Sequence, residues 1–134
     1  MIAEYIKRFH NCTILELLDC VITPHGCEFL APAFMPKASA LEMIKLDHNP
    51  IGSEGALLLA EGLARNTNIQ LLSLSYCDIG PDGAQGLFEI LIFQNSKMLE
   101  INLQGNPLVN EGAILVFQGL AAAKTLQDVC LADC

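Results

Sequence analysis

Apolar and polar positions recur along the chain with a period of 28 or 29 residues. Apolar side chains two residues apart point to the same side of an extended strand. In the third unit, this alternation predicts a short strand whose Leu72 and Leu74 side chains enter a core while Ser73 and Ser75 face outward. Each unit has the pattern apolar-x-x-apolar-x-apolar-x-x-(Asn or Cys)-x-apolar, and the units begin at Cys12, Leu41, Ile69, Met98 and Leu126.

A glycine follows the Asn or Cys position by six residues in each of the first four units and opens a helical pattern. From each glycine, apolar residues recur every four positions, which places them on one face of a helix. Pro32 lies inside the first of these helices and removes a backbone hydrogen bond, so this helix should be short or kinked, and Pro36 should end it. The helix faces are Gly26/Leu30/Phe34, Gly55/Leu59/Leu63, Gly83/Leu87/Leu91 and Gly112/Val116/Leu120.

The residue that follows each strand alternates strictly between cysteine and asparagine. A side chain of either kind can bond backbone groups that the turn leaves unpaired. Equivalent residues in alternate units are 57 positions apart, so the sequence repeats in pairs of units as well as in single ones. The alternating residues are Cys20, Asn49, Cys77, Asn106 and Cys134.

These repeats resemble the leucine-rich repeats of the ribonuclease-inhibitor type, which also occur in NOD-like receptors and in Ran GTPase-activating proteins. The resemblance implies an α/β solenoid, a curved right-handed βα superhelix with parallel strands on the concave face and helices on the convex face. It covers the whole chain, so residues 1–134 are predicted to be one domain. The predicted divisions are a partial repeat 1–11, repeats 12–40, 41–68, 69–97 and 98–125, and a partial repeat 126–134.

The two ends of the sequence carry the same apolar pattern as the repeats, whereas a capping unit presents a polar outer face. We therefore expect either a piece of a longer solenoid or ends that pair with copies of the chain or with another subunit.

Composition limits the function. Fifteen acidic residues against seven basic ones give a formal net charge of −8, which argues against general binding of nucleic acid or of an anionic membrane. No apolar run approaches the roughly 20 residues that span a bilayer, and the first residues are too polar for a signal peptide. Six cysteines in such a chain indicate reduced thiols and a cytoplasmic location.

The resemblance places the second, third, fifth, seventh and eighth residues of each unit on the concave face. Seven of these are acidic and only Lys45 is basic, which predicts a protein partner with a basic or mixed-polar surface. Tyr76 would be a rigid aromatic anchor. The alternative is that the acidic residues only keep a solvated sheet soluble. The predicted partner-binding residues are Glu16, Asp19, Met43, Lys45, Asp47, His48, Tyr76, Glu100, Asn102 and Gln104.

The other basic residues fall near the ends of the predicted helices, where a positive charge suits the helix dipole. Together with the acidic strands, they predict an acidic inner face and a basic rim. These basic residues are Lys7, Arg8, Lys37, Arg65, Lys97 and Lys124.

The sequence gives little support for a catalytic site or a metal site. A nucleophilic pair of Cys77 with His48 is disfavoured, because Cys77 occupies the buried turn position. The three histidines fall in different parts of the unit, and there is no Cys-x-x-Cys spacing, so neither a metal nor a cofactor is predicted. Disulfides within the Cys20, Cys77 and Cys134 series are excluded, because alternate strands lie roughly 10 Å apart. Cys130 should face outward, as a reactive thiol or as an ordinary exposed cysteine.

The sequence thus predicts a non-enzymatic protein-interaction module. The resemblance also permits a regulator of a small GTPase, although no functional residue of the Ran GTPase-activating proteins could be matched to a position here. Ligand sensing, as in NOD-like receptors, is a third possibility. The chain contains no nucleotide-binding module, but such a module would lie outside it if the chain is a piece of a longer protein.

Overall fold

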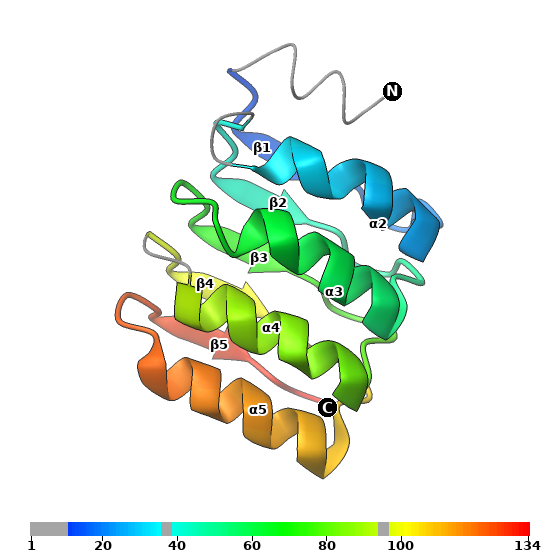
Figure 1. The fold of residues 1–134 in the computed structure, drawn as a ribbon, viewed down its shortest axis with the longest axis vertical. Helices are drawn as coiled ribbons and strands as arrows, with labels where there is room; N and C mark the ends of the chain where they lie inside the picture. The colour runs from blue at the N-terminus through cyan, green and yellow to red at the C-terminus, as the bar shows by residue number, and fades with distance from the viewer. Residues whose placement is uncertain (1–10, 36–38, 94–96) are drawn as a thin grey trace.

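The computed structural model describes residues 11–35, 39–93 and 97–134. Strands and helices alternate along this part of the chain, and they form two layers, with the sheet on one side and the helices on the other (Figure 1). In chain order the elements are β1 (Ile14–Glu16), α2 (Pro24–Leu30), the 3-10 helix η1 (Ala31–Phe34), β2 (Met43–Lys45), α3 (Gly52–Leu63), β3 (Leu71–Ser73), α4 (Pro81–Phe93), β4 (Glu100–Asn102), α5 (Val109–Ala122) and β5 (Asp128–Cys130).

The five strands form one parallel sheet in the order β1-β2-β3-β4-β5. The register pairs equivalent positions of successive units. Leu15 is opposite Ile44, Ile44 opposite Leu72, Leu72 opposite Ile101, and Ile101 opposite Val129. The predicted α/β leucine-rich repeat solenoid is therefore confirmed, strand by strand.

The core lies between the two layers. Leu72 and Leu74 are buried as predicted, and so are their equivalents Ile44, Leu46, Ile101 and Leu103. The helices lie close to one another where the repeated glycine occurs. At Gly83 an added Cβ would stand 2.8 Å from the Cα of Ser53 in the preceding helix, so only a residue without a side chain fits there.

The first helix differs from the others, as Pro32 predicted. The helix α2 ends at Leu30 after 7 residues, and the chain continues as the 3-10 helix η1 with Pro32 in its first turn. The helices α3, α4 and α5 have 12, 13 and 14 residues. The prediction for Pro36 falls outside the described residues.

The alternating turn residues connect each unit to the one before it. The Asn106 side chain donates to the carbonyl oxygens of Leu74, at 2.7 Å, and Leu103, at 2.8 Å. Its Oδ1 accepts from the backbone N–H groups of Cys77 and Ile79, both at 3.1 Å. Asn49 repeats this arrangement with Leu17, Leu46, Cys20 and Ile22.

The cysteines at this position also bond to the preceding unit, and we call these asparagine and cysteine contacts together the ladder. A thiol has a single hydrogen to donate. The Cys77 thiol donates to the Leu46 carbonyl at 3.2 Å, and the Cys134 thiol donates to the Leu103 carbonyl at 3.0 Å. These carbonyls are equivalent to those that the asparagines reach in the preceding unit. Each asparagine oxygen also accepts from the backbone N–H of the cysteine in the unit before it.

The backbone of the turns also repeats. The eighth residue of every unit has a positive φ, between 51° and 72°. A second left-handed residue follows at a position that alternates, directly after the cysteine in Val21 and Asp78 and three residues after the asparagine in Gly52 and Val109. Valine rarely adopts this conformation, so Val21 and Val109 are strained. The left-handed eighth-position residues are Asp19, His48, Tyr76, Gly105 and Asp133.

Ser73 and Ser75 lie on the outward side of the strand, as predicted, but water does not reach them. Both residues are buried, because the Asp47 carboxylate of the neighbouring unit covers them. The alternation of strand residues correctly gives the side of the sheet, but the neighbouring strand decides how much of that side water reaches.

Candidate functional site

The outward side chains of β1 to β5, with the turn residues that follow each strand, form a surface that we call the strand face. A groove of about 280 Å³ crosses the first four strands at their amino-terminal ends. The register places Ile14, Met43 and Leu71 side by side across β1, β2 and β3, and Leu99 lies directly before β4. The groove is lined by Thr13, Ile14, Glu42, Met43, Gln70, Leu71, Leu99 and Glu100.

The groove combines apolar side chains that water reaches with acidic ones. Ile14 is 57% exposed and Leu99 is 39% exposed, although both are large and apolar. Glu42 and Glu100 are also exposed. Apolar side chains that gather on a folded surface are typical of binding sites, whereas single exposed ones are ordinary.

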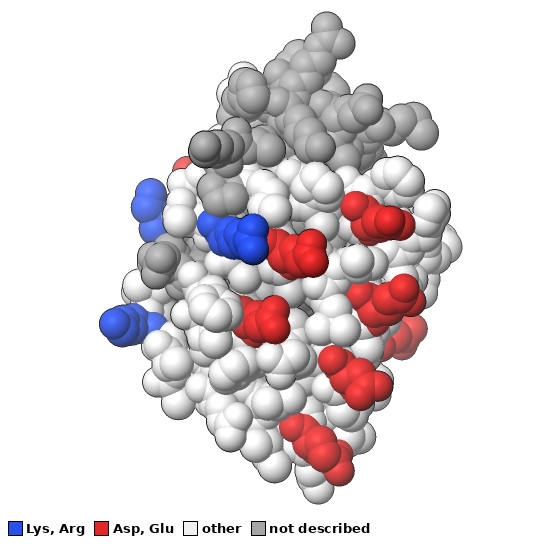
Figure 2. Space-filling model, viewed as in Figure 1, with Lys and Arg blue, Asp and Glu red and all other residues white. Residues whose placement is uncertain are grey.

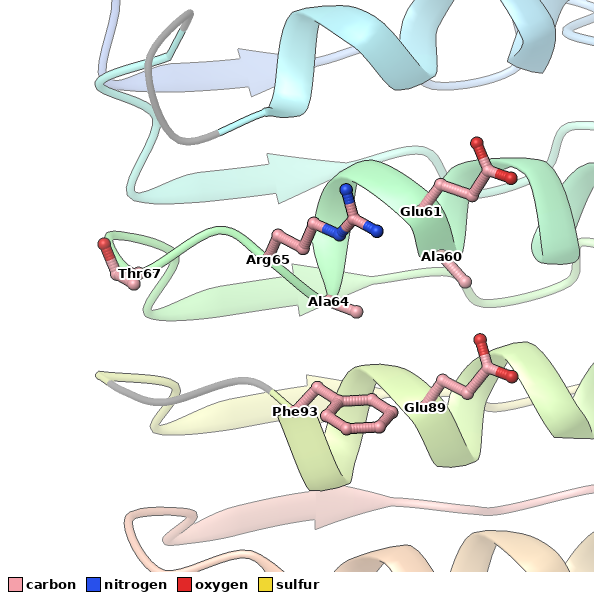
Figure 3. Close-up of a pocket in the computed structure, with 7 residues that line it drawn as sticks. All are labelled: Ala60, Glu61, Ala64, Arg65, Thr67, Glu89 and Phe93. Atoms are coloured by element: carbon pink, nitrogen blue, oxygen red, sulfur yellow. The ribbon is translucent and has the colours of Figure 1, made fainter.

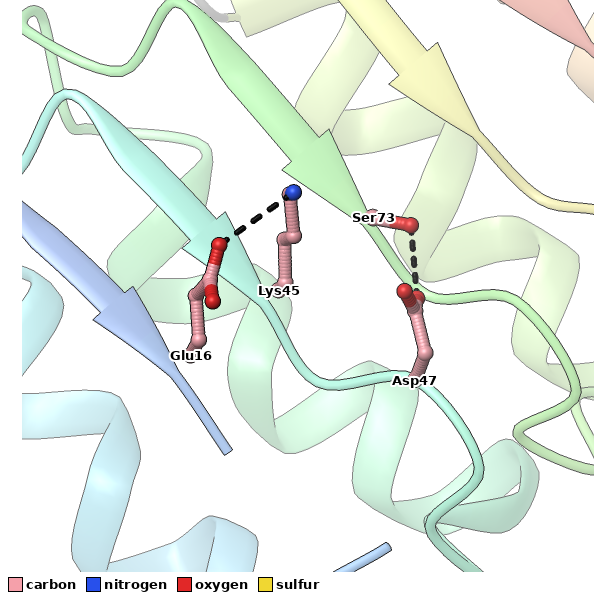
Figure 4. A network of polar contacts seen from close by, with 4 residues as sticks. All are labelled: Glu16, Lys45, Asp47 and Ser73. Atoms are coloured by element: carbon pink, nitrogen blue, oxygen red, sulfur yellow. Dashed lines mark hydrogen bonds and ion pairs between the residues drawn. The ribbon is translucent and has the colours of Figure 1, made fainter. Parts of the chain in front are cut away.

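Beside this groove, Lys45 on β2 lies over Glu16 on β1. The Lys45 Nζ and a Glu16 carboxylate oxygen are 3.2 Å apart (Figure 4). Both side chains remain partly exposed, so the ion pair contributes at most about 1 kcal/mol to stability. Its larger effect is to neutralise the one basic residue predicted on this face, which leaves the other carboxylates in excess.

Asp47, which follows β2, connects this strand to β3 of the next unit. One of its oxygens accepts a hydrogen bond from the Ser73 hydroxyl at 2.6 Å (Figure 4). The same oxygen accepts from the Ser75 backbone N–H at 2.9 Å. Asp47 is half-buried. The structure therefore gives this predicted binding residue a structural contact.

An aromatic pair stands at the carboxyl-terminal edge of the strands. The rings of His48 and Tyr76 stack with their centroids 4.9 Å apart and an angle of 9° between their planes. Tyr76 in turn covers Gly105, where an added Cβ would stand 2.3 Å from the ring. The two rings are neighbours because both residues occupy the left-handed eighth position.

The remaining predicted residues lie along the same surface. Asp19 is exposed in the first turn, and Asn102 and Gln104 are half-buried in and after β4. The Gln104 amide is 3.5 Å from a carboxylate oxygen of Asp133 in the next turn. The structure thus places all ten predicted residues on the strand face, in two groups. Met43 and Glu100 border the groove, and the others lie on the strands or turns beyond it.

The predicted contrast between an acidic inner face and a basic rim is incomplete. Acidic side chains also gather over the helices (Figure 2). Arg65, Lys97 and Lys124 lie in the loops that follow α3, α4 and α5, near helix ends as predicted, although none of the described helices has a basic residue in its last turn. Lys7, Arg8 and Lys37 fall outside the described residues. The acidic residues of the helices are Glu28, Glu54, Glu61, Asp82, Glu89 and Glu111.

The buried cysteines are poor nucleophiles. Burial raises the pKa of the Cys77 thiol to about 11, and burial with the nearby Cys77 raises that of Cys27 to about 12. Cys77 therefore stays protonated near neutral pH, which disfavours its pairing with His48 as a catalytic dyad. Cys130 is half-buried on β5, and its reactivity stays a prediction. Within residues 11–35, 39–93 and 97–134, no group of His, Cys, Asp and Glu could hold a metal ion.

Sequence reasoning missed part of this site. The concave-face positions include the apolar Ile14, Met43, Leu71 and Leu99, of which Ile14 and Leu99 are exposed and Leu71 is half-buried. Only Met43 of these four is among the predicted partner-binding residues, so the groove itself was not predicted. Its signal was the apolar residue at the third position of the first three units. A second groove, between α3 and α4, was not predicted at all.

These features define a solenoid of strand-turn-helix repeats joined by a ladder of asparagine and cysteine side chains. The family model described as "Leucine Rich repeat" matches residues 41–60, 65–88 and 94–117. The chain belongs to the leucine-rich repeat family, and its relatives identify the ribonuclease-inhibitor type.

Ribonuclease inhibitor from Sus scrofa is 32% identical over 122 residues, covering 90% of this chain. The human "NACHT, LRR and PYD domains-containing protein 14" is 32% identical over 122 residues, covering 89% of this chain. The chain spans 26% of the length of the first relative and 11% of the second. Among solved structures, "Leiomodin-1 Actin-Binding Site 2 (ABS2)" superimposes with a TM-score of 0.82 at 18% identity, over 96% of this chain and 76% of the other, and shows the fold alone.

A search of the described helices finds none that combines the length and apolar character needed to cross a membrane.

Proposed function

We propose that this chain is a non-enzymatic protein-binding module that engages its partner through the strand face. The observation that carries the proposal is the groove across β1 to β4, whose Ile14 and Leu99 are exposed despite their size. Interfaces gain most from a few apolar or aromatic anchors surrounded by polar groups, and this groove provides that combination.

The charge of the face indicates the chemistry of the partner. Glu42 and Glu100 border the apolar floor, while Lys45 is already paired with Glu16. A partner with a basic or mixed-polar surface would neutralise the free carboxylates and increase the rate of association. The ribonuclease inhibitors among the relatives are, by their name, proteins that act on another protein, which agrees with this class of function. The six free cysteines favour the cytoplasm as the place of binding.

The test compares which proteins the immobilised chain retains from a cell extract. The double variant Glu42→Lys/Glu100→Lys reverses two charges of the groove, and Glu54→Lys/Glu111→Lys reverses two exposed charges on α3 and α5. We expect retained proteins to be lost with the first variant and kept with the second. Retention of the same proteins by both variants, with both variants folded by circular dichroism, would contradict the proposal.

A further inference from the structure

The helix layer carries a second groove, which the proposed strand-face function does not use. It lies between the carboxyl-terminal halves of α3 and α4 and has a volume of about 470 Å³ (Figure 3). Its lining includes Ala60 and Ala64 from the α3 segment and Glu89 and Phe93 from α4. The strand-face groove is formed by other residues on the opposite layer, so the two surfaces are separate.

The repeat pattern explains why the groove opens at this step. Ala60 and Ala64 occupy the positions at which the next unit carries Phe88 and Ile92. Two small side chains on α3 therefore stand where α4 has two large ones. The two helices are in close contact nearer their beginnings, where an added Cβ on Gly86 would be 3.0 Å from the Ala56 carbonyl oxygen. Ala60 belongs to this contact, because a Cβ on Gly86 would stand 3.3 Å from its Cβ, and both alanines are buried. The groups that water reaches around the groove include Glu61, Glu89 and Phe93.

One wall of the groove presents a large ring to water. Phe93, the last residue of α4, is 61% exposed. An aromatic side chain beside a hollow lined by alanine can gain buried area from a bulky apolar side chain that enters the hollow. The apolar part of the groove is thus suited to one such side chain.

The groove carries two carboxylates, Glu61 and Glu89, against one basic side chain, Arg65, so its net charge is negative. Glu61 and Glu89 occupy the same position in consecutive units, and Figure 3 shows their carboxylates on adjacent helices pointing in the same direction. Glu89 accepts a hydrogen bond from Gln85 at 3.3 Å, but the ion pairs found in the described part of the chain join only His25 to Glu28 and Lys45 to Glu16. The flanking units have Pro32 and Gln118 at this position, so the carboxylate pair belongs to this step alone.

We propose that this helix-face groove binds a short segment of a partner protein that carries a single basic residue beside a bulky apolar one. The basic side chain lies between the Glu61 and Glu89 carboxylates, and the apolar one packs against the exposed ring of Phe93. Arg65, which also lines the groove, repels a run of basic residues and so selects for a single positive charge.

The experiment selects peptides from a phage-displayed random library on the immobilised chain and measures the affinity of their synthetic forms. We expect the selected peptides to share a lysine or arginine beside an aromatic or aliphatic residue. Glu61→Lys and Phe93→Ser should each weaken their binding about tenfold or more. Both residues are exposed, so these variants should fold normally, which a thermal melt checks.

Two matched variants keep this test specific. Glu111→Lys makes the same charge change on α5, away from the groove, and Glu100→Lys makes it on the strand face. Both should bind the selected peptides within about twofold of the parent chain. The proposal is overturned if no peptide is enriched, if Glu61→Lys binds the peptides unchanged, or if Glu100→Lys alone abolishes binding. The last result would assign the peptides to the strand face, leaving the proposed function intact.

Discussion

Removing the Asn106 side chain tests whether the asparagine and cysteine ladder holds the units together. The residue is fully buried, and its amide makes four hydrogen bonds of 2.7 to 3.1 Å to backbone groups of its own and the preceding unit. Asn106→Ala leaves two backbone N–H groups and two carbonyls without this partner. Each unsatisfied buried group costs about 1–3 kcal/mol, and local relaxation recovers part of the sum. We expect a loss of about 3–5 kcal/mol.

A loss of this size is a large fraction of the about 5–15 kcal/mol by which a domain is stable. It should lower the melting temperature by roughly 10–20 °C in a circular dichroism melt. Asn106→Cys, which copies the residue of the alternate units, should lose less, because a thiol restores one donor. Asn110→Ala is the matched control, since Asn110 is exposed, and it should change stability by less than about 0.5 kcal/mol. If Asn106→Ala had the same melting temperature as Asn110→Ala, the side-chain hydrogen bonds of the asparagine and cysteine ladder would not contribute to stability.

Three further results are expected. Val109→Gly should raise the melting temperature by a few degrees, because glycine adopts the φ of 48° at this position without the strain of a valine side chain. The equivalent residue of the second unit, Gly52, is already a glycine. A lower melting temperature would contradict the strain at Val109. Gly105→Ala should destabilise the chain, because the new methyl group meets the Tyr76 ring at a φ of 72°, and an unchanged melt would refute that contact. The Cys27 and Cys77 thiols should resist a maleimide reagent in the folded chain. Burial raises their pKa values from 9.0 to about 12 and about 11 in the folded state, so the protonated thiols favour folding below pH 9. The free energy of unfolding should therefore fall as the pH rises from about 9 towards 11. A stability that did not change over this pH range would contradict the burial of the two thiols.

The repeat pattern predicted the sheet well because strand residues and core residues are set within one unit. Leu72 and Leu74 had to point inward whatever surrounded them. The burial of Ser73 was not predicted, because its exposure depends on a carboxylate from the adjacent unit, Asp47. Neighbouring units also decide the helix-face groove, which forms where the small Ala60 stands at the position that Phe88 fills in the next unit.

The candidate site was predicted as a face but not as a set of contacts. The left-handed turns that bring His48 and Tyr76 into a stack leave no signal in apolar spacing, since each turn contributes a different residue at that position. The strand-face groove depends on the register that aligns Ile14, Met43 and Leu71, which the spacing within one unit does not determine. The spacing of residues within one unit therefore predicts which side chains share the strand face, whereas the contacts and grooves on that face depend on packing between units.

The most direct measurement is the affinity of a retained partner for two leucine variants, Leu99→Lys and Leu57→Lys, by titration calorimetry. The two leucines are 39% and 41% exposed, but Leu99 lines the strand-face groove and Leu57 lies on α3. The proposed function predicts that Leu99→Lys weakens binding by about tenfold or more while Leu57→Lys binds like the parent chain. Equal affinities for Leu99→Lys and the parent chain would contradict it.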